Sequence, residues 1–346
     1  MASFRFIPLL TLVIFYTINV GNGDATSVAM HPPNFPISKP AAPAAAPYPY
    51  HHPRSSPVIK AAYWPSFDAF PASAIDTSYF THLYSAFLLP EPITYKLNVT
   101  QFDQVKIPEL MGALGTKNPP VITLLSIGGG GNDPIVFSRM ASSWATRKTF
   151  IDSTIEVARK YGFHGVDLDW EFPANEEDMS NLALLYKQWQ EALVDEARTC
   201  GKSHLLLTSA VYYASKFTDV PRSYPTYAIT RYVDWVTLLD PNTNLSTIYG
   251  IGSWIQSGVP PSQLVMGLPL YGRTWTLQDP DTNGIGAPAL GPWLGGGVTD
   301  SWIGYDDVRS IRVKIQAARS WQLRGYFFWA LGQDKPIRIG PSQDKP

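Results

Sequence analysis

Eight short apolar runs, separated by longer stretches of mixed character, limit the folds open to this chain more than any other feature. Near-continuous apolar runs are typical of parallel strands that are covered on both faces, with helices in the intervening stretches. The pattern therefore predicts alternating strands and helices around a parallel sheet. The runs are Val58 to Trp64, His82 to Leu88, Val121 to Ile127, Gly165 to Trp170, His204 to Tyr212, Val233 to Leu239, Leu264 to Leu270 and Leu323 to Ala330.

Three of the intervening stretches carry clear helical signals. We predict helices over Ala145 to Tyr161, about Glu176 to Cys200 and roughly Asp306 to Trp321. Asn175 is a good N-cap for the second helix, and the acids that follow it suit the positive end of a helix dipole. Eight strands alternating with helices favour an α/β fold of the (β/α)8 TIM barrel type. A doubly wound open sheet is the alternative, but no Gly-x-Gly-x-x-Gly motif opens a helix after the first strand.

The amino terminus has the pattern of a secretory signal peptide. Arg5 precedes an apolar run from Phe6 to Val20, and the small residues Gly21 and Gly23 follow it. This arrangement predicts a signal peptide over residues 1–23 and therefore an exported protein. We expect it to be secreted, by an extracellular, cell-wall or vacuolar route, with no membrane anchor once the signal is removed.

The next segment differs in composition from the rest of the chain. Pro, Ala and Ser dominate it and leave little to bury, which predicts a flexible leader over residues 24–57. A barrel domain would then occupy residues 58–346.

Cys200 is the only cysteine, so the chain can form no internal disulfide. We expect a monomer.

The charge balance points to a neutral ligand. The net charge of -1 excludes the strongly basic surface that nucleic acid binding requires, so we expect no nucleic acid partner. Aromatic residues make up 13% of the chain against 16% charged residues, which suits stacking on sugar rings. Asn98 and Asn244 each begin an Asn-x-Ser/Thr sequon and are candidate glycosylation sites.

The strongest chemical signal is an alternation of acids between Gly165 and Glu171. In a strand, Asp167, Asp169 and Glu171 point to one face, and three carboxyls in a desolvated place cannot all ionise. The raised pKa that results suits a general acid, and Glu171 lies nearest the carboxyl end where barrel active sites form. A solvated polar face and a divalent metal site are the alternatives. We expect no metal and no cofactor. The opposite face would pack under helices and consists of Val166, Leu168, Trp170 and Phe172.

Besides this acidic motif, the chain contains further recognisable sequence blocks. Seven blocks in all, including the acidic one, lie between Ala61 and Leu331 and are spread over nearly the whole domain. They are Tyr63-Trp64, LLSIGGGG at Leu124 to Gly131, YGFHGVDLDWEFP at Tyr161 to Pro173, LLLTSAVYY at Leu205 to Tyr213, GLPLYGRTW at Gly267 to Trp275, WIGYDD at Trp302 to Asp307 and GYFFWAL at Gly325 to Leu331. In type and order they resemble glycoside hydrolase family 18, and most closely the plant class V chitinases.

The resemblance implies a substrate-assisted retaining mechanism on chitin or N-acetylglucosamine oligosaccharides. Glu171 would protonate the leaving oxygen, Asp169 would orient the acetamido group of the substrate, and Asp167 would share charge and proton with Asp169. Tyr271 and Arg273 would either contact sugar or only brace the loop after the seventh strand. The other implied substrate-binding or supporting residues are Trp329 as the floor, Tyr63, Tyr212 and Tyr271 as candidates for its rim, and Ser126 and Gly129 as supports of the acidic strand.

The sequence departs from the family in three places. The family's sixth strand normally ends with Met, a small residue, Tyr and Asp, but Trp235 to Asn242 has no Tyr there, and Asp240 or Asn242 could supply part of its role. The stretch Thr276 to Ser301 is too short for the usual α+β insertion between strands seven and eight, which predicts a shallower cleft. No amphipathic stretch follows Leu331, so we expect the last helix to be missing or truncated.

Two functional hypotheses follow. The first is a secreted hydrolase of β-1,4-linked N-acetylglucosamine polymers with reduced activity. The second is an inactive barrel that binds chitin oligosaccharides as a lectin, or a protein as an inhibitor. The three acids favour the first hypothesis, and the missing Tyr favours the second.

Overall fold

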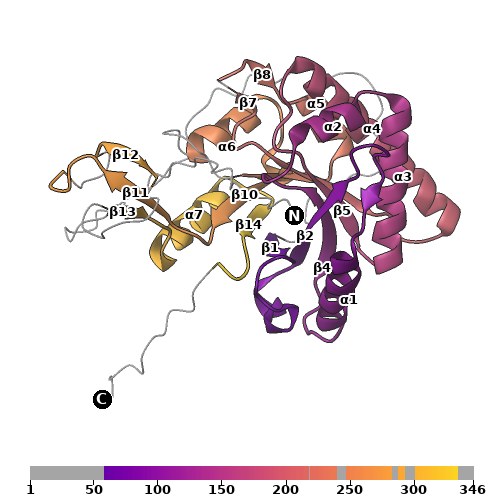
Figure 1. Cartoon of the computed structure of the whole chain (residues 1–346), viewed down its shortest axis with the longest axis horizontal. Coiled ribbons are helices and arrows are strands. Elements are labelled where there is room, and N and C mark those ends of the chain that lie inside the picture. The colour runs from indigo at the N-terminus through magenta and orange to yellow at the C-terminus, as the bar shows by residue number, and fades with distance from the viewer. Residues whose placement is uncertain (1–57, 218, 240–246, 283–286, 293–300, 334–346) are drawn as a thin grey trace, which may run out of the picture.

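Eight parallel strands close into a barrel in the computed structural model, which describes residues 58–217, 219–239, 247–282, 287–292 and 301–333 (Figure 1). The barrel is closed because β1 pairs with both β2 and β14. The predicted (β/α)8 TIM barrel is confirmed. In sheet order its strands are β1 (Ile59–Pro65), β2 (His82–Pro90), β4 (Ile122–Gly128), β5 (Gly165–Asp169), β6 (Leu206–Val211), β9 (Trp235–Leu238), β10 (Leu264–Pro269) and β14 (Gly325–Trp329).

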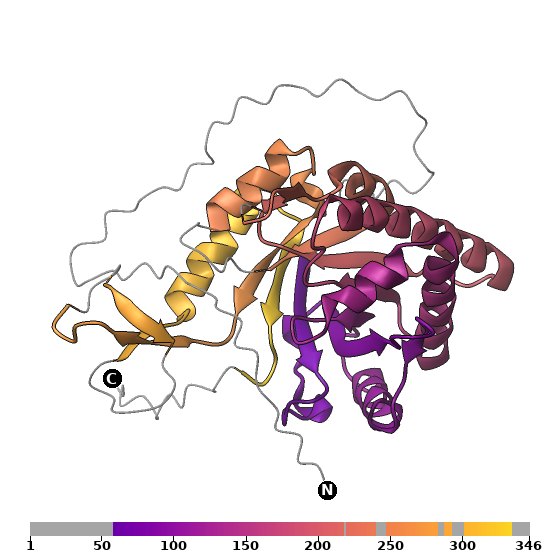
Figure 2. The ribbon, with the colours of Figure 1, turned by 45° about the horizontal axis from the view of Figure 1, so that its top comes forward.

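Helices connect the barrel strands and pack around them (Figure 2). Ser143 and Thr146 form a capping box at the start of α3, and Asn175 accepts from the Asp178 backbone at the start of α4. The three predicted helices are confirmed to within two residues, whereas four others had not been assigned. The helices are α1 (Gln101–Gly115), α2 (Pro134–Ala141), α3 (Trp144–Tyr161), α4 (Glu176–Cys200), α5 (Thr226–Tyr232), α6 (Thr247–Gln256) and α7 (Val308–Ser320).

Short elements complete the described chain. They are the 3-10 turns η1 (Ala72–Ala74), η2 (Thr77–Tyr79) and η3 (Pro261–Gln263), the strand β3 (Leu97–Asn98) beside β2, and the hairpin of β7 (Lys216–Phe217) and β8 (Arg222–Ser223). Among the described residues, no helix has the length and apolar character needed to cross a membrane.

The alternation of strand β5 sorts its side chains into two layers. Val166 and Leu168 point outward and belong to the apolar layer between barrel and helices, where both are fully buried. Asp167 and Asp169 point inward. The barrel interior is otherwise mainly aromatic and aliphatic, with Tyr63, Tyr84, Trp235 and Phe327 among its members. The acids therefore stand in a desolvated place, as their alternation predicts.

The stretch between β10 and β14 contains more regular structure than its composition suggests. It forms a three-stranded antiparallel sheet of β11 (Arg273–Leu277), β12 (Ala289–Pro292) and β13 (Ser301–Gly304). This sheet projects from one side of the barrel (Figure 1). The insertion is short, as expected, but it is a small β-sheet. Residues 1–57 and 334–346 lie outside the described chain, and so do the predictions for the signal peptide, the leader and the last helix.

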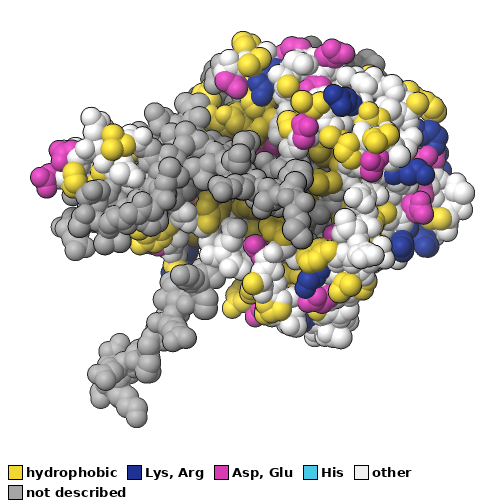
Figure 3. Space-filling model, viewed as in Figure 1, with side chains coloured by type: hydrophobic (Ala, Val, Ile, Leu, Met, Phe, Trp, Pro, Cys, Tyr) yellow, Lys and Arg dark blue, Asp and Glu magenta, His cyan; other side chains and the backbone are white. Residues whose placement is uncertain are grey.

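Acidic and basic side chains are interspersed on the described part of the face seen in Figure 3. Lys and Arg lie beside Asp and Glu over the helical part of the molecule. On this face neither sign forms a continuous field of the kind that steers a charged polymer.

Candidate active site

The three acids of the motif lie at the carboxyl end of β5. Asp167 and Asp169 are buried side chains of the strand, with 0% and 3% exposed, and Glu171 follows two residues later with part of its surface exposed. The peptide bond after Glu171 is cis. Because active sites of TIM barrels form at this end of the strands, the arrangement is placed to act on a ligand above the barrel.

Asp167 is held by three hydroxyl donors. The Ser126 hydroxyl donates to Oδ2 over 2.7 Å and the Tyr63 hydroxyl donates to the same oxygen over 2.9 Å. The Thr208 hydroxyl donates to Oδ1 over 2.6 Å. Burial raises the pKa of Asp167, and these three hydrogen bonds oppose that shift because they stabilise the charged form.

Asp169 and Glu171 form a coupled pair joined by a side-chain hydrogen bond. Burial, followed by the charges of Glu171 and Asp167, raises the pKa of Asp169 well above its ordinary value. Burial also raises the pKa of Glu171, to about 7, against hydrogen bonds from Asp169 and the Gly130 backbone. At neutral pH the pair therefore holds at least one proton, as a general acid requires. Oδ1 of Asp169 is buried and has no hydrogen-bond partner among the described residues.

The glycine loop after β4 closes over these acids. The Gly129 backbone donates to the Asp169 carbonyl over 2.8 Å. Gly128 and Gly129 both have positive φ, and a Cβ on Gly128 would lie 1.9 Å from the same carbonyl oxygen. Only glycine permits this backbone to approach so closely. The structure thus places Ser126 and Gly129, the two expected supporting residues, directly against the acidic strand.

Trp329 ends β14, at the same carboxyl-terminal edge of the barrel at which β5 ends. Its ring stacks on Phe87, with centroids 5.4 Å apart, and meets the edge of Tyr63 at 5.3 Å. Trp329 keeps part of its surface exposed, whereas Tyr63 is only 1% exposed. Tyr63 therefore lies below the expected rim position, where it links Trp329 to Asp167.

The remaining expected contact residues lie around the mouth of the barrel. Tyr212 is half-buried, stacks on Phe217 at 4.2 Å and meets the edge of Phe172 at 5.4 Å. Tyr271 is also half-buried, in the turn between β10 and β11. Arg273 begins β11, where its backbone pairs with Gly304.

The described parts of the chain contain no group of three His, Cys, Asp or Glu side chains arranged to hold a metal ion. Asp167 illustrates why the acids of β5 do not form one: both its oxygens already accept hydrogen bonds from hydroxyl groups. Asn98 is exposed on β3. Asn244 and the end of the sixth barrel strand, Asp240 to Asn242, lie outside the described residues.

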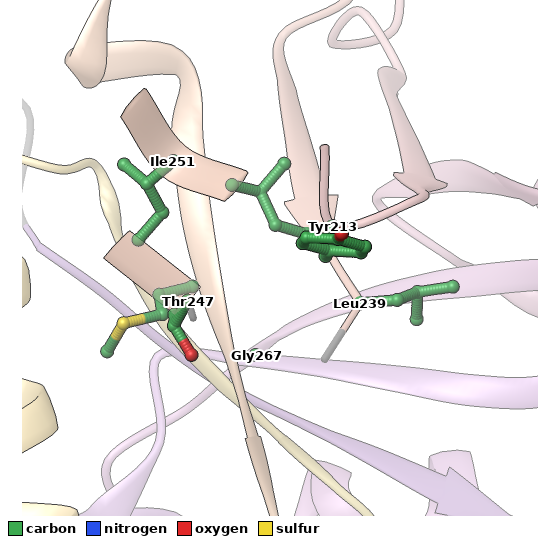
Figure 4. Close-up of a pocket in the computed structure, with 7 residues that line it drawn as sticks. Tyr213, Leu239, Thr247, Ile251 and Gly267 are labelled. Atoms are coloured by element: carbon green, nitrogen blue, oxygen red, sulfur yellow. The ribbon is translucent and has the colours of Figure 1, made fainter. Parts of the chain in front are cut away.

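A small and mainly apolar pocket lies between β9, β10 and α6 (Figure 4). None of the three acids lines it, so it is separate from the site on β5. Its lining residues are Tyr213, Leu238, Leu239, Thr247, Ile251, Met266 and Gly267.

Comparison with known proteins identifies the family. The model of glycosyl hydrolases family 18 matches residues 59–334. The chain belongs to glycoside hydrolase family 18. This match spans the whole barrel and confirms the relationship that the sequence blocks predict. The chain is therefore a family 18 glycoside hydrolase.

Class V chitinases are among its similar relatives. Class V chitinase CHIT5 of Lotus japonicus is 48% identical over 340 residues, covering 83% of this chain and 85% of that protein. A mutant class V chitinase from Nicotiana tobaccum in complex with NAG4 has a TM-score of 0.75 at 32% identity, with 81% of this chain and 95% of that chain covered. The chitinase-like agglutinin RobpsCRA from Robinia pseudoacacia has a TM-score of 0.74 at 37% identity, with 80% and 96% covered.

Three residues around the acids escaped the sequence analysis: Thr208, Gly130 and Phe87. Thr208 lies opposite Asp167 in the register of β5 and β6, so strand pairing could have indicated it. Gly130 lies in the same glycine run as Gly129, but nothing in the run distinguishes the glycine that touches Glu171. Phe87 carries no sequence signal, because its contact with Trp329 joins opposite ends of the chain.

Proposed function

We propose that this chain hydrolyses β-1,4 bonds of chitin or chito-oligosaccharides by a substrate-assisted retaining mechanism, with Glu171 as the general acid. The observation that carries the proposal is the coupled pair of Asp169 and Glu171 above a fully hydrogen-bonded Asp167. The pKa of Glu171, raised to about 7 chiefly by burial, keeps its proton available in neutral and mildly acidic solution.

The proposed first step uses the substrate as its own nucleophile. Glu171 donates its proton to the glycosidic oxygen, and the acetamido carbonyl oxygen attacks the anomeric carbon as the leaving sugar departs. Oδ1 of Asp169, which lacks a partner among the described residues, suits the acetamido N–H. A donor at that oxygen favours the charged form of Asp169 and therefore shifts proton density toward Glu171 and Asp167.

The second step restores the enzyme. Glu171, now a carboxylate, takes a proton from water, which attacks the same anomeric carbon and opens the cyclic intermediate. Two displacements at one carbon retain its configuration. Trp329, half-buried and braced by Phe87 and Tyr63, is proposed as the floor beneath the reacting sugar.

We also propose that turnover is reduced. The sixth strand lacks the family's Tyr, and loss of one positioned donor to developing charge costs about two to three orders of magnitude in rate.

A second candidate function is sugar binding without hydrolysis, favoured by the similarity to a chitinase-like agglutinin. The acids of β5 support hydrolysis, because buried carboxyls cost stability in a protein that only binds.

The experiment is hydrolysis of a fluorogenic N-acetylglucosamine oligomer by the wild type, Glu171→Gln and Glu177→Gln. Glu177 is an exposed acid in the first turn of α4 and serves as the control. We expect Glu171→Gln to lose at least about a hundredfold in kcat while oligosaccharide binding persists, and Glu177→Gln to match the wild type. Undiminished turnover in Glu171→Gln would remove Glu171 as the acid. Binding with no product from folded wild type would favour the agglutinin-like function.

Export is proposed from the sequence, and glycosylation from the sequence and the exposure of Asn98. We propose cleavage near Gly23, secretion of the remaining chain and a glycan at Asn98, whose exposure leaves room for one. Mass spectrometry of the protein secreted from a eukaryotic host would give the mature amino terminus and the glycan mass. Retention of residues 1–23 would contradict the proposal.

A further inference from the structure

The inner acid of the site is held by a residue with no assigned role in the reaction. Thr208 lies on β6, fully buried, in the register position opposite Asp167. Ser126 holds the matching position on β4. Register partners in a parallel sheet present their side chains to the same face. Asp167 is therefore flanked on both neighbouring strands by hydroxyl groups inside the barrel.

The contact from Thr208 is the shortest of the three that Asp167 accepts, 2.6 Å against 2.7 and 2.9 Å. It is also the only one of the three that reaches Oδ1, because Ser126 and Tyr63 share Oδ2. Thr208 therefore supplies a donor to the second oxygen of the carboxyl group, which Ser126 and Tyr63 do not reach.

The Thr208 hydroxyl donates to Asp167 over 2.6 Å, whereas the other acceptor near it, the Val166 carbonyl, lies 3.4 Å away. The Trp235 indole N–H donates to the Tyr84 hydroxyl oxygen over 2.9 Å, and the Tyr84 hydroxyl interacts with Thr208. Because the Tyr84 oxygen accepts the indole proton, its own proton can point to the Thr208 oxygen. The single Thr208 proton then remains for Asp167.

Within the described part of the chain, the titratable groups that interact with Asp167 carry no positive charge. Tyr63 from β1, Tyr84 from β2, Asp169 from β5 and Tyr186 from α4 interact with it. The phenols are neutral, since burial raises the pKa of each above its ordinary value, and Asp169 and its partner Glu171 are acids. The stabilisation of the charged form of Asp167 thus depends on its hydroxyl donors.

We propose that Thr208 is a positioning residue for the reaction: its hydroxyl keeps Asp167 as the charged member of the three acids, so that Asp167 can share the proton of Asp169 when substrate binds. This inference rests on the proposed hydrolysis, and it assigns to Thr208 an effect on the proton balance that a purely structural hydroxyl would lack.

The test uses Thr208→Val, which keeps the shape of the side chain but removes the donor, and Thr208→Ser, which restores it. Ser209→Ala is the matched control. Ser209 is the next residue on β6 and 1% exposed, but it faces outward and binds Tyr186 and the Leu168 carbonyl. Both Thr208→Val and Ser209→Ala remove one buried hydroxyl from the same strand.

The first readout is kcat/KM as a function of pH. Losing a hydrogen bond to a charged carboxylate changes its ionisation equilibrium by roughly tenfold, which raises the pKa of Asp167. We expect the acid limb of the kcat/KM profile of Thr208→Val to move up by about one pH unit. The acid limbs of Thr208→Ser and Ser209→Ala should stay within a few tenths of a pH unit of the wild type. An unmoved limb in active Thr208→Val would overturn the proposal.

The second readout needs no activity. The Thr208 donor stabilises charged Asp167, so its contribution is present above the pKa of that group and fades as acid protonates it. The difference in Tm between wild type and Thr208→Val should therefore narrow as pH falls from 7 to 4. The difference in Tm between wild type and Ser209→Ala should stay constant over the same range. A constant difference for Thr208→Val overturns the role of Thr208, and absence of hydrolysis by wild type overturns only the proposed function.

Discussion

Gly130→Ala should remove most of the activity without unfolding the protein. A Cβ at this position would lie 2.8 Å from one carboxyl oxygen of Glu171 and 3.2 Å from its Cδ. Ordinary contact begins near 3.4 Å, so the carboxyl must retreat by about 0.6 Å. Displacements approaching 1 Å cost about a hundredfold in rate, so we expect kcat to fall by about ten- to a hundredfold. The Gly130 φ is not positive, so alanine does not strain the backbone.

The neighbouring glycine provides the control. A Cβ at Gly131 meets nothing within 4 Å, and its φ is not positive either. The assay is hydrolysis of a fluorogenic oligomer, with Tm measured on the same samples. We expect Gly131→Ala to match the wild type in both, and Gly130→Ala to keep a Tm within a few degrees because the tip of a flexible side chain can move aside. Full activity in Gly130→Ala would refute the placement of Glu171 against this loop.

Two further predictions concern pH. As the proposed acid, Glu171 has to hold its proton, and burial raises its pKa to about 7. We therefore expect kcat/KM to decline about tenfold per pH unit above 7, and a profile flat to pH 9 would contradict the proposed role. Burial, followed by the charge of Arg324, lowers the pKa of His82 to about 4. Since the unfolded chain binds this proton below about pH 6.5, up to about 3 kcal/mol of unfolding free energy should be lost between pH 6.5 and 4. Urea unfolding at pH 7 and 4 should show a smaller loss in His82→Gln, and equal losses would exclude His82.

The strands and long helices could be predicted because their signals are local. Glu176–Cys200 begins and ends where the N-cap and apolar pattern place it. By contrast, α1 went unassigned: its apolar residues do not gather on one face, and Pro108 lies inside it. The capping box of Thr100 and Asp103 was the available signal for its start. The small sheet of β11, β12 and β13 was missed because its pairing joins segments separated by Gly- and Pro-rich sequence.

The acids could be predicted as a set, because strand alternation alone places Asp167 and Asp169 inside the barrel. The depth at which each aromatic side chain lies in the barrel could not be predicted. Tyr63 was expected at the rim, yet its burial depends on Tyr84 stacking at 4.4 Å and on Trp329 from the last strand. Such depth is set by side chains that are distant in sequence, and strand periodicity carries no information on it.

In the barrel, β1 and β14 lie side by side although they come from opposite ends of the described chain. At about 5–20 residues per second, a ribosome releases them tens of seconds apart. During that interval one side of β1 is an unpaired strand edge, which invites association with other chains. Trp329 arrives with β14, so the nascent protein can assemble its acids well before it has the residue proposed to support the sugar. Completion of the last strand therefore ends the exposure of that edge and brings Trp329, the proposed floor, into place in a single event.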